Sequence, residues 1–159
     1  MDWNSDLAAG ITGTSANQLG HMVRLGIVEP AAEASRRGVS HRFDFKNLVE
    51  MTIGAEFFDA GITAFNVAEA VRRVQENWTA LCNPETRDEV AVLALLRSPG
   101  DARPNRTDLG DTPVNLLTLM GPVNAFQDAW IVTGYTVHAA INVKWIIDSL
   151  ERITRVRCA

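Results

Sequence analysis

Cysteine and long apolar runs are both scarce in this chain. It has only two cysteines, Cys82 and Cys158, too few for a disulfide framework or a cysteine-based metal cluster. We expect both to be free thiols in a cytoplasmic protein, where disulfides are rare. The apolar run at residues 90–96 is far shorter than the ~20 residues needed to cross a bilayer, so we expect no membrane partner. Residues 1–6 lack a basic stretch followed by an apolar one, so we expect no signal peptide.

Catalytic and cofactor motifs are missing as well. The histidines form no HExxH pair, the serines have no nucleophile-elbow glycines, and there is no glycine-rich phosphate loop. We therefore expect no catalytic residues, no metal and no cofactor, and we do not expect an enzyme. The net charge of −4 also counts against binding to nucleic acid by bulk electrostatics alone, because proteins that bind in this way are usually basic. Nucleic-acid contact would need a local basic region.

Two short helices are predicted near the start of the chain. Residues 5–10 suit a first helix that Ser5 caps and Gly10 ends. A second helix, over residues 15–25, begins after a hydroxyl that can accept a free amide N–H of the first turn. Its apolar side chains recur at helical spacing on one face: Leu19, Met22 and Val23. Gly26 follows as a helix stop in the left-handed conformation.

A hairpin and two longer helices are predicted next. Residues 27–28 suit a short strand, residues 29–41 carry turn chemistry, and residues 41–45 alternate polar and aromatic side chains as a second strand. A helix follows to about residue 59. Another begins after Thr63, with five side chains expected to be buried: Phe65, Val67, Ala68, Val71 and Val74.

The second half of the chain has a different composition. We expect strands at residues 90–96 and 114–120, a loop between them at residues 98–113, a tight hairpin at residues 133–134 and a final amphipathic helix from about residue 144. The Asn83-Pro84 pair breaks the helical pattern before these strands. The sequence thus predicts an α+β fold. Its first domain spans residues 1–80, and a small mixed α/β domain spans residues 87–159.

One ungapped pattern joins eight residues near the start: Thr12, Gly13, Ser15, Leu19, Gly26, Ile27, Val28 and Pro30. It resembles the first module of the DNA-binding domain of the MerR family of bacterial regulators. Four later residues look like the wing and the following helix of that family: Gly38, Arg42, Phe43 and Leu48. Gly61 and Ile62 resemble the link between its next two helices. The resemblance covers residues 5–76 and implies a winged helix-turn-helix that binds double-stranded DNA.

The chain departs from that family in three respects. The family usually has an Arg-Tyr pair in its recognition helix, where this chain has Gly20 and His21. A glycine within a helix costs about 1 kcal/mol relative to alanine. The family dimerises through a long helix that Asn83-Pro84 would break here, so we expect the C-terminal domain to form the homodimer. No cysteine set for metal sensing is present either.

The polar face of the second helix supplies the candidate base contacts: Asn17, Gln18 and His21, with Ser15 at its start. Asparagine and glutamine can each make two hydrogen bonds to adenine in the major groove. Six further side chains are candidates for phosphate contact: Arg24, Arg36, Arg37, His41, Arg42 and Lys46. Five cationic and three acidic residues lie between residues 15 and 46, so positive charge is concentrated there. The alternative to DNA contact is that these side chains form an ordinary solvated surface.

These observations favour a dimeric, sequence-specific transcriptional regulator, a repressor of bacterial or phage origin. An architectural, excisionase-like DNA-binding factor or an antitoxin-type interaction module is the alternative. Four aromatic side chains lie in the C-terminal half: Phe126, Trp130, Tyr135 and Trp145. They could form a core, a dimer interface or a ligand cage, and we favour a core or a dimer interface. The sequence does not indicate an effector ligand.

Overall fold

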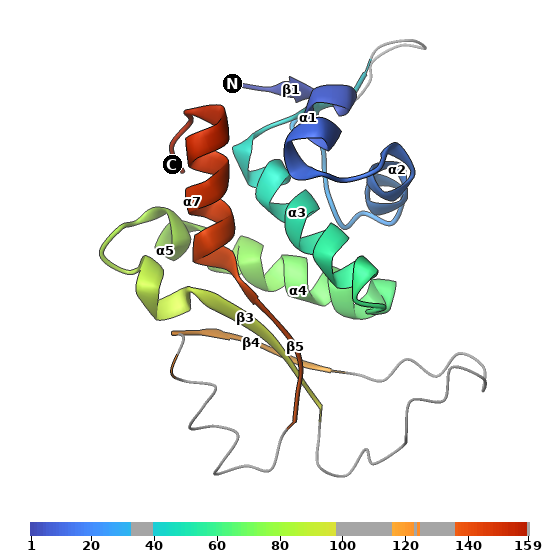
Figure 1. Cartoon of the computed structure of the whole chain (residues 1–159). Coiled ribbons are helices and arrows are strands. Elements are labelled where there is room, and N and C mark those ends of the chain that lie inside the picture. Colours follow the sequence, from blue (N-terminus) through green and yellow to red (C-terminus); the bar gives the residue numbers. More distant parts are fainter. Residues whose placement is uncertain (33–39, 98–115, 123, 125–135, 159) are drawn as a thin grey trace, which may run out of the picture.

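The structure is a computed structural model that describes residues 1–32, 40–97, 116–122, 124 and 136–158. Within these residues the chain forms six α-helices, one short 3-10 helix and two small antiparallel sheets. The helices pack together, and the larger sheet extends from one end of the helical part (Figure 1). The fold is therefore mixed α and β, as the sequence predicts.

The first helix, α1, spans Ser5–Thr12 and differs at both ends from the prediction. Its N-cap is Asn4, whose Oδ1 accepts a hydrogen bond from the amide of Leu7 at 2.9 Å, rather than Ser5. Gly10 does not end the helix, which continues to Thr12 and stops at Gly13 with φ of +70°. Gly13 can end the helix because glycine adopts positive φ without a steric cost. Gly10 keeps the helical conformation.

The second helix, α2, spans Ala16–Arg24. Of the two hydroxyl residues that could cap it, Thr14 and Ser15, the cap is Ser15, and the predicted Gly26 stop is confirmed. Gly26 has φ of +68°, its amide bonds to the carbonyl of Val23, and the Ile27 amide bonds to the carbonyl of Met22 at 2.9 Å. These two bonds are those of a Schellman motif, which satisfies the last carbonyls of a helix. The predicted strand at residues 27–28 is wrong, because these amides close α2 instead of pairing with a strand.

The strand β2, Arg42–Phe43, pairs with a segment that the sequence did not indicate. Its antiparallel partner is β1, Trp3–Asn4, in the register Trp3 to Phe43. A single antiparallel bridge also joins Ala32 to Arg42. The predicted hairpin therefore begins to close at this bridge, and its residues 33–39 lie outside the described part of the chain.

The two long helices are confirmed as α3, Phe45–Asp59, and α4, Ala64–Glu76. Of the five side chains expected to be buried in α4, the three valines are buried, Ala68 is half-buried and Phe65 is 59% exposed. Asn66 is instead 2% exposed. Asn66 is buried because its Oδ1 accepts the amide of Leu116, which ties α4 to the segment leading into β4. A short helix α5, Trp78–Cys82, ends before Pro84, and a 3-10 turn η1 follows at Arg87–Val90.

The larger sheet has the order β4-β3-β5 and is antiparallel throughout. It consists of β3 (Val92–Arg97), β4 (Leu117–Gly121) and β5 (Thr136–Asn142). The strand β5 leads directly into the final helix α7, Val143–Thr154 (Figure 1). The predicted loop at residues 98–113 and hairpin at residues 133–134 lie outside the described residues, as do Phe126, Trp130 and Tyr135.

The residues before and after the predicted boundary at residues 80–87 share one hydrophobic core. The helix α7 lies beside α3 (Figure 1), and its buried residues Ile146, Ile147 and Leu150 belong to the same cluster as Leu48 and Val71. Trp145, expected in a core or an interface, is 64% exposed. The division into two domains stays a prediction, and the two parts have an extensive apolar contact.

The expectation of two free thiols is wrong. Cys82 and Cys158 form a disulfide across 76 residues of sequence, with their Cα atoms 4.9 Å apart. The end of the chain is also held by Glu151, which accepts the amide of Cys158 at 2.9 Å. Spacing in the sequence does not show this proximity, because it depends on how α7 packs against the other helices.

The crossing of α2 and α3 generates a first prediction. A Cβ added at Gly54 in α3 would lie 2.5 Å from Sδ of Met22, which is fully buried. Overpacking costs about 1–3 kcal/mol, and the gain in helix propensity offsets about 1 kcal/mol. We expect Gly54→Ala to lower the free energy of unfolding by about 1 kcal/mol in urea denaturation.

Gly10→Ala provides the matched control. Gly10 also lies within a helix, but a Cβ there would meet no atom within 4 Å. This variant should be as stable as the parent or more stable, by up to about 1 kcal/mol. If Gly54→Ala were stabilised to the same extent, close packing of α2 on α3 at this point would be contradicted.

Candidate nucleic-acid interface

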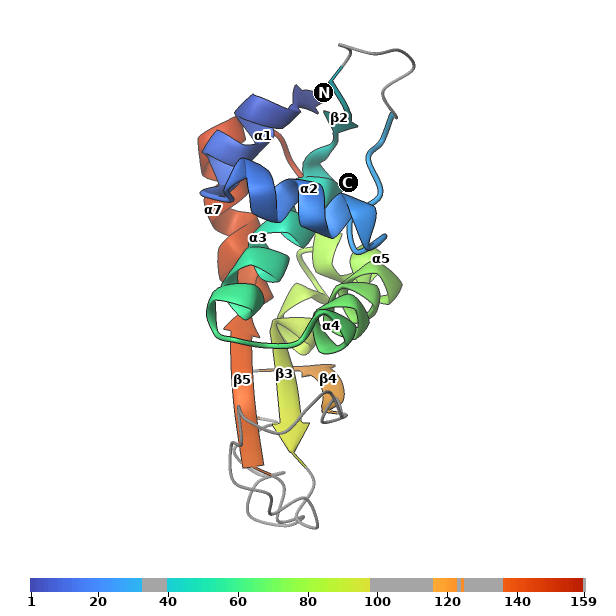
Figure 2. The same cartoon turned by 90° about the vertical axis from the view of Figure 1, so that its right-hand side faces the viewer.

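The helix α2 has one buried side and one exposed side. Leu19 and Met22 are buried against the core, and the solvent-exposed stripe consists of Ala16, Asn17, Gly20 and Arg24. Figure 2 shows α2 crossing in front of α3, at the surface of the helical part. The exposed stripe is therefore accessible along its length for contact with a partner.

Two of the candidate base-contacting residues are already hydrogen-bonded to one another. Ser15 Oγ accepts the amide of Gln18 at 3.2 Å, and Gln18 Oε1 accepts the amide of Ser15 at 3.0 Å. Gln18 Nε2 also donates to Asp59 Oδ1 at 2.8 Å, at the end of α3. Ser15 and Gln18 thus hold α2 in place, and the side chain of Gln18 is not free for a base. The sequence did not single out Asp59.

His21 is half-buried beside the same end of α3. Its ring lies 5.6 Å from that of Phe58, and its Nδ1 is 3.2 Å from Nη2 of Arg24. Arg24 itself is exposed. Asn17 is also exposed, and among the described residues no hydrogen bond or ion pair is found for its side chain. Asn17 and Arg24 are therefore the polar side chains of α2 that point to solvent.

A buried asparagine holds both arms of the predicted hairpin. Asn47, in the first turn of α3, is 5% exposed. Its Oδ1 accepts the amides of Ala31 and Asp44, both at 3.2 Å, and its Nδ2 donates to the carbonyl of Glu29 at 2.9 Å and to Glu50 Oε2 at 3.1 Å. All four hydrogen bonds that an amide side chain can make are formed. Sequence reasoning missed Asn47, although its spacing from Asp44 matches the capping box that it forms with that residue.

The candidate phosphate contacts are distributed over the hairpin and the start of α3. Arg42 is exposed on β2, and Lys46 is half-buried in the first turn of α3. His41 is half-buried, with its ring centroid 6.3 Å from that of Phe43. Arg36 and Arg37 lie outside the described residues. Arg24 and Arg42 are thus the exposed candidate cations in the part of the chain that the structure places.

Two arginines of α4 are held by acidic neighbours on the same helix. Arg72 pairs with Glu69 and Glu76, and Arg73 pairs with the same two carboxylates at 3.3 and 3.2 Å. These residues lie three or four positions apart, the spacing that brings helical side chains together. Arg72 and Arg73 therefore belong to a neutral helix surface.

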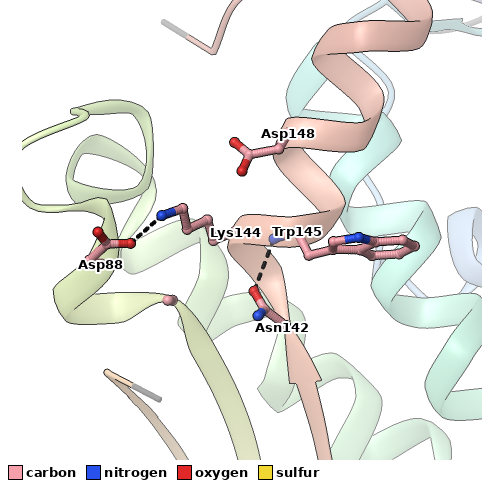
Figure 3. Close-up of a pocket in the computed structure, with 6 residues that line it drawn as sticks. Asp88, Asn142, Lys144, Trp145 and Asp148 are labelled. Atoms are coloured by element: carbon pink, nitrogen blue, oxygen red, sulfur yellow. Dashed lines mark hydrogen bonds and ion pairs between the residues drawn. The ribbon is translucent and has the colours of Figure 1, made fainter. Parts of the chain in front are cut away.

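A hollow of about 450 Å³ lies beside the start of α7 (Figure 3). Its charged and amide side chains each have a partner: Lys144 pairs with Asp88, Asp148 accepts from Arg87 at 2.8 Å, and Asn142 caps α7. The Trp145 ring points away from the Asp88–Lys144 pair (Figure 3). This hollow thus offers no free carboxylate pair for acid–base chemistry.

A second basic group lies at the other side of the molecule. Arg152, Arg155 and Arg157 are exposed at the C-terminal end of α7, where the helix dipole favours cations. The C-terminus and α2 lie on opposite sides (Figure 1). This group is therefore separate from the exposed stripe of α2.

In the part of the chain that the structure describes, no group of three or more histidine, cysteine or acidic side chains could hold a metal ion. The described helices are also all too short or too polar to cross a membrane. No family model matches this chain, and no curated protein matches its sequence.

The carboxyl group next to Asn47 generates a prediction about pH. Glu50 is 1% exposed, and burial raises its pKa above the ordinary value of 4.5, although hydrogen bonds from Gln75 and Asn47 and the charge of Lys46 lower it. Asp44 adds to the increase. The folded state therefore favours the neutral acid, and its stabilisation is present below the unfolded pKa and lost as the pH rises through the folded pKa.

We expect Glu50→Gln to remove this loss, because glutamine stays neutral and the amide of Gln75 can rotate to accept its N–H group. The free energy of unfolding of the variant relative to the parent should increase as the pH rises from about 4.5 to about 8. Urea denaturation at several pH values measures it. A difference that stays constant over this range would contradict the prediction.

Proposed function

We propose that this protein is a sequence-specific DNA-binding regulator with a winged helix-turn-helix. In this proposal α1 and α2 form the helix-turn-helix, and residues 29–45 form the wing. The observation that carries the proposal is the exposed stripe of α2, which presents an unengaged Asn17 and an exposed Arg24 on a helix anchored by its opposite face. An α-helix of this kind fits the major groove of DNA.

The chemistry of each side chain suggests its role. The side-chain amide of Asn17 can donate to N7 and accept from the N6 amino group of adenine, which presents both in the major groove. Arg24 and Arg42 are suited to phosphate oxygens, and the wing would bring Arg36 and Arg37 to the backbone. Gln18 and Ser15 are assigned to positioning α2, because they bond to each other and Gln18 also donates to Asp59.

A homodimer is part of the proposal. One short helix contacts only a few base pairs, and two copies on neighbouring half-sites multiply discrimination between sequences. We assign dimerisation to the residues after the predicted boundary, and we propose that the protein acts as a bacterial or phage repressor. The resemblance to the MerR family supports the fold and the groove-binding helix in this proposal.

Selection of bound genomic fragments, followed by gel shifts with competitor DNA, tests the proposal. Binding to a defined, two-fold symmetric site that resists competitor would support a dimeric regulator. Weak, unselective binding with bending would instead favour the architectural, excisionase-like alternative. If no DNA is retained at low salt, the DNA-binding proposal fails, and the antitoxin-type interaction module becomes the better explanation.

Asn17→Ala should relax sequence choice at one position of each half-site. The loss of two hydrogen bonds to a base reduces discrimination by about 1–3 kcal/mol. The stability of the fold should be unchanged, because Asn17 is exposed. Affinities for a set of sites with single base changes measure the effect. Unchanged discrimination at every position would remove Asn17 from the interface.

Arg42→Gln should weaken binding to all sequences alike and reduce the slope of log affinity against log salt by about 1, since one phosphate contact is lost. Arg72→Gln is the matched control: it removes the same charge from an exposed position where Glu69 and Glu76 already pair with it. Equal effects of the two variants on the salt slope would indicate that net charge, rather than the position of Arg42, governs binding.

A further inference from the structure

Three exposed arginines line a hollow at the C-terminal end of α7, which we call the arginine hollow. Its volume is about 440 Å³, and its lining consists of Asp148, Glu151, Arg152, Arg155 and Arg157. The C-terminus and α2 lie on opposite sides of the molecule (Figure 1), so the arginine hollow is separate from the proposed DNA interface. A hollow of this size can hold a small organic molecule.

The two carboxylates of the arginine hollow already have cationic partners. Asp148 accepts a hydrogen bond from Arg87 at 2.8 Å. Glu151 pairs with Arg87 at 3.5 Å and with Arg157 at 3.1 Å, and it is almost completely buried. Neither carboxylate is therefore left to neutralise a further arginine.

Two of the three arginines have no carboxylate partner in the described part of the chain. Arg152 donates to the carbonyl of Asp148 at 3.3 Å and to Oγ of Ser149 at 3.2 Å. For the side chain of Arg155, no hydrogen bond or ion pair with another described residue is found. With Arg87 included, four guanidinium groups surround two carboxylates, although the chain as a whole has a net charge of −4. The dipole of α7 offsets only about half a unit of this excess positive charge.

The backbone of Arg155 adopts a conformation that is unfavourable for its side chain. Its φ is +59°, the only positive φ of a non-glycine residue in the described chain. The left-handed conformation brings Cβ close to the following carbonyl oxygen, so helices commonly end on glycine here, as α1 and α2 do at Gly13 and Gly26. An arginine in place of glycine indicates a role for its side chain beyond ending the helix.

The segment that carries Arg155 and Arg157 is held in place. The disulfide joins Cys158 to Cys82 at the end of α5, and the amide of Cys158 donates to Oε1 of Glu151 at 2.9 Å. These bonds return the chain to the side of α7 after the helix ends. They therefore keep the two arginines beside the arginine hollow instead of leaving them on a free tail.

We propose that the arginine hollow binds the phosphate group of a small phosphate monoester. The two guanidinium groups without a carboxylate partner carry two positive charges, and a phosphate monoester carries about −1.5 to −2 at pH 7. Each guanidinium group can donate two parallel hydrogen bonds to phosphate oxygens. The volume of the hollow also accommodates the organic part of the molecule. The proposal does not depend on the proposed function, because α2 takes no part in it.

Calorimetric titration of the full chain with glycerol 3-phosphate tests the proposal, with glycerol as the uncharged control. Glycerol 3-phosphate should bind saturably at one site, and glycerol should not bind. Sedimentation with phosphatidylcholine vesicles that contain phosphatidic acid distinguishes a lipid headgroup from a soluble phosphate. The vesicles should not retain the protein.

Arg155→Gly is the most informative variant. It removes one unpaired guanidinium group and gives the position a residue that accepts positive φ, so the unfolding temperature should stay close to that of the parent. The affinity for glycerol 3-phosphate should fall at least about tenfold. Arg72→Gln is the matched control, because it removes the same charge from an exposed position where Glu69 and Glu76 already pair with it. Its affinity should equal that of the parent.

Reduction of the disulfide tests the position of the tail. Dithiothreitol gives two electrons and two protons to the Cys82–Cys158 bond, which becomes two thiols, and is itself oxidised to a cyclic disulfide. The affinity for glycerol 3-phosphate should then fall. The helical content should be kept, because the buried residues Ile146, Ile147 and Leu150 hold α7 in the core. Cys158→Ser should bind as weakly as the reduced parent.

Four results would overturn the proposal. They are the absence of saturable binding at millimolar glycerol 3-phosphate, binding to the vesicles alone, parental affinity in Arg155→Gly, and an equal loss of affinity in Arg155→Gly and Arg72→Gln. Parental affinity after reduction would remove the tail, and Arg157 with it, from the site. None of these measurements involves DNA, so the failure of this proposal and the failure of the proposed function are distinguishable.

Discussion

The buried side chain of Asn47 is the constraint on which the arrangement of the N-terminal half depends. Its four hydrogen bonds reach the segment after α2, the residue before α3 and the carboxyl of Glu50. Because buried polar groups are costly when unpaired, the chain on both sides of the hairpin is fixed relative to α3. The same helix holds α2 through the close approach of Gly54 to Met22. The exposed stripe and the hairpin base thus share one rigid support.

Most of the helices could be predicted from the sequence because their signals are local. Ser15 and Gly26 define α2 through bonds within a few residues, so the hydroxyl cap and the glycine stop were predictable, although the sequence left the cap open between Thr14 and Ser15. The errors have two origins: one local motif was mistaken for another, or distant contacts decide the structure. Residues 27–28 are apolar in the way that a strand is, but their amides complete the end of α2. The β2 strand has two residues, too short for a periodic pattern, and pairs with a segment about forty residues earlier. The disulfide depends on the docking of α7.

The sequence predicted the helix of the candidate interface, but it identified only some of the side chains that are exposed on it. The pattern of apolar residues shows which side of α2 is buried, and Asn17 and Arg24 are exposed as that pattern implies. It does not show that the end of α3 approaches the edge of the polar face. That approach engages Gln18 with Asp59 and places His21 beside Phe58. A polar residue at the border of a helix face can either contact a partner or hold the helix, and only its distant neighbours decide between these roles.

The distribution of charge limits how such a protein could bind DNA. Several cations of the described residues are paired within the chain, among them Arg72, Arg87 and Lys144, and the arginines at the end of α7 lie on the side opposite α2. Among the described residues, Arg24 and Arg42 are the exposed candidate cations of the proposed interface, and the net charge of the chain is −4. Phosphate contacts supply most of the affinity that is independent of sequence, so such affinity should be low for a single copy. Selective binding would then depend on the fit of α2 to base edges and on a second copy, which is why the shape of its exposed stripe carries more weight than the number of its charges.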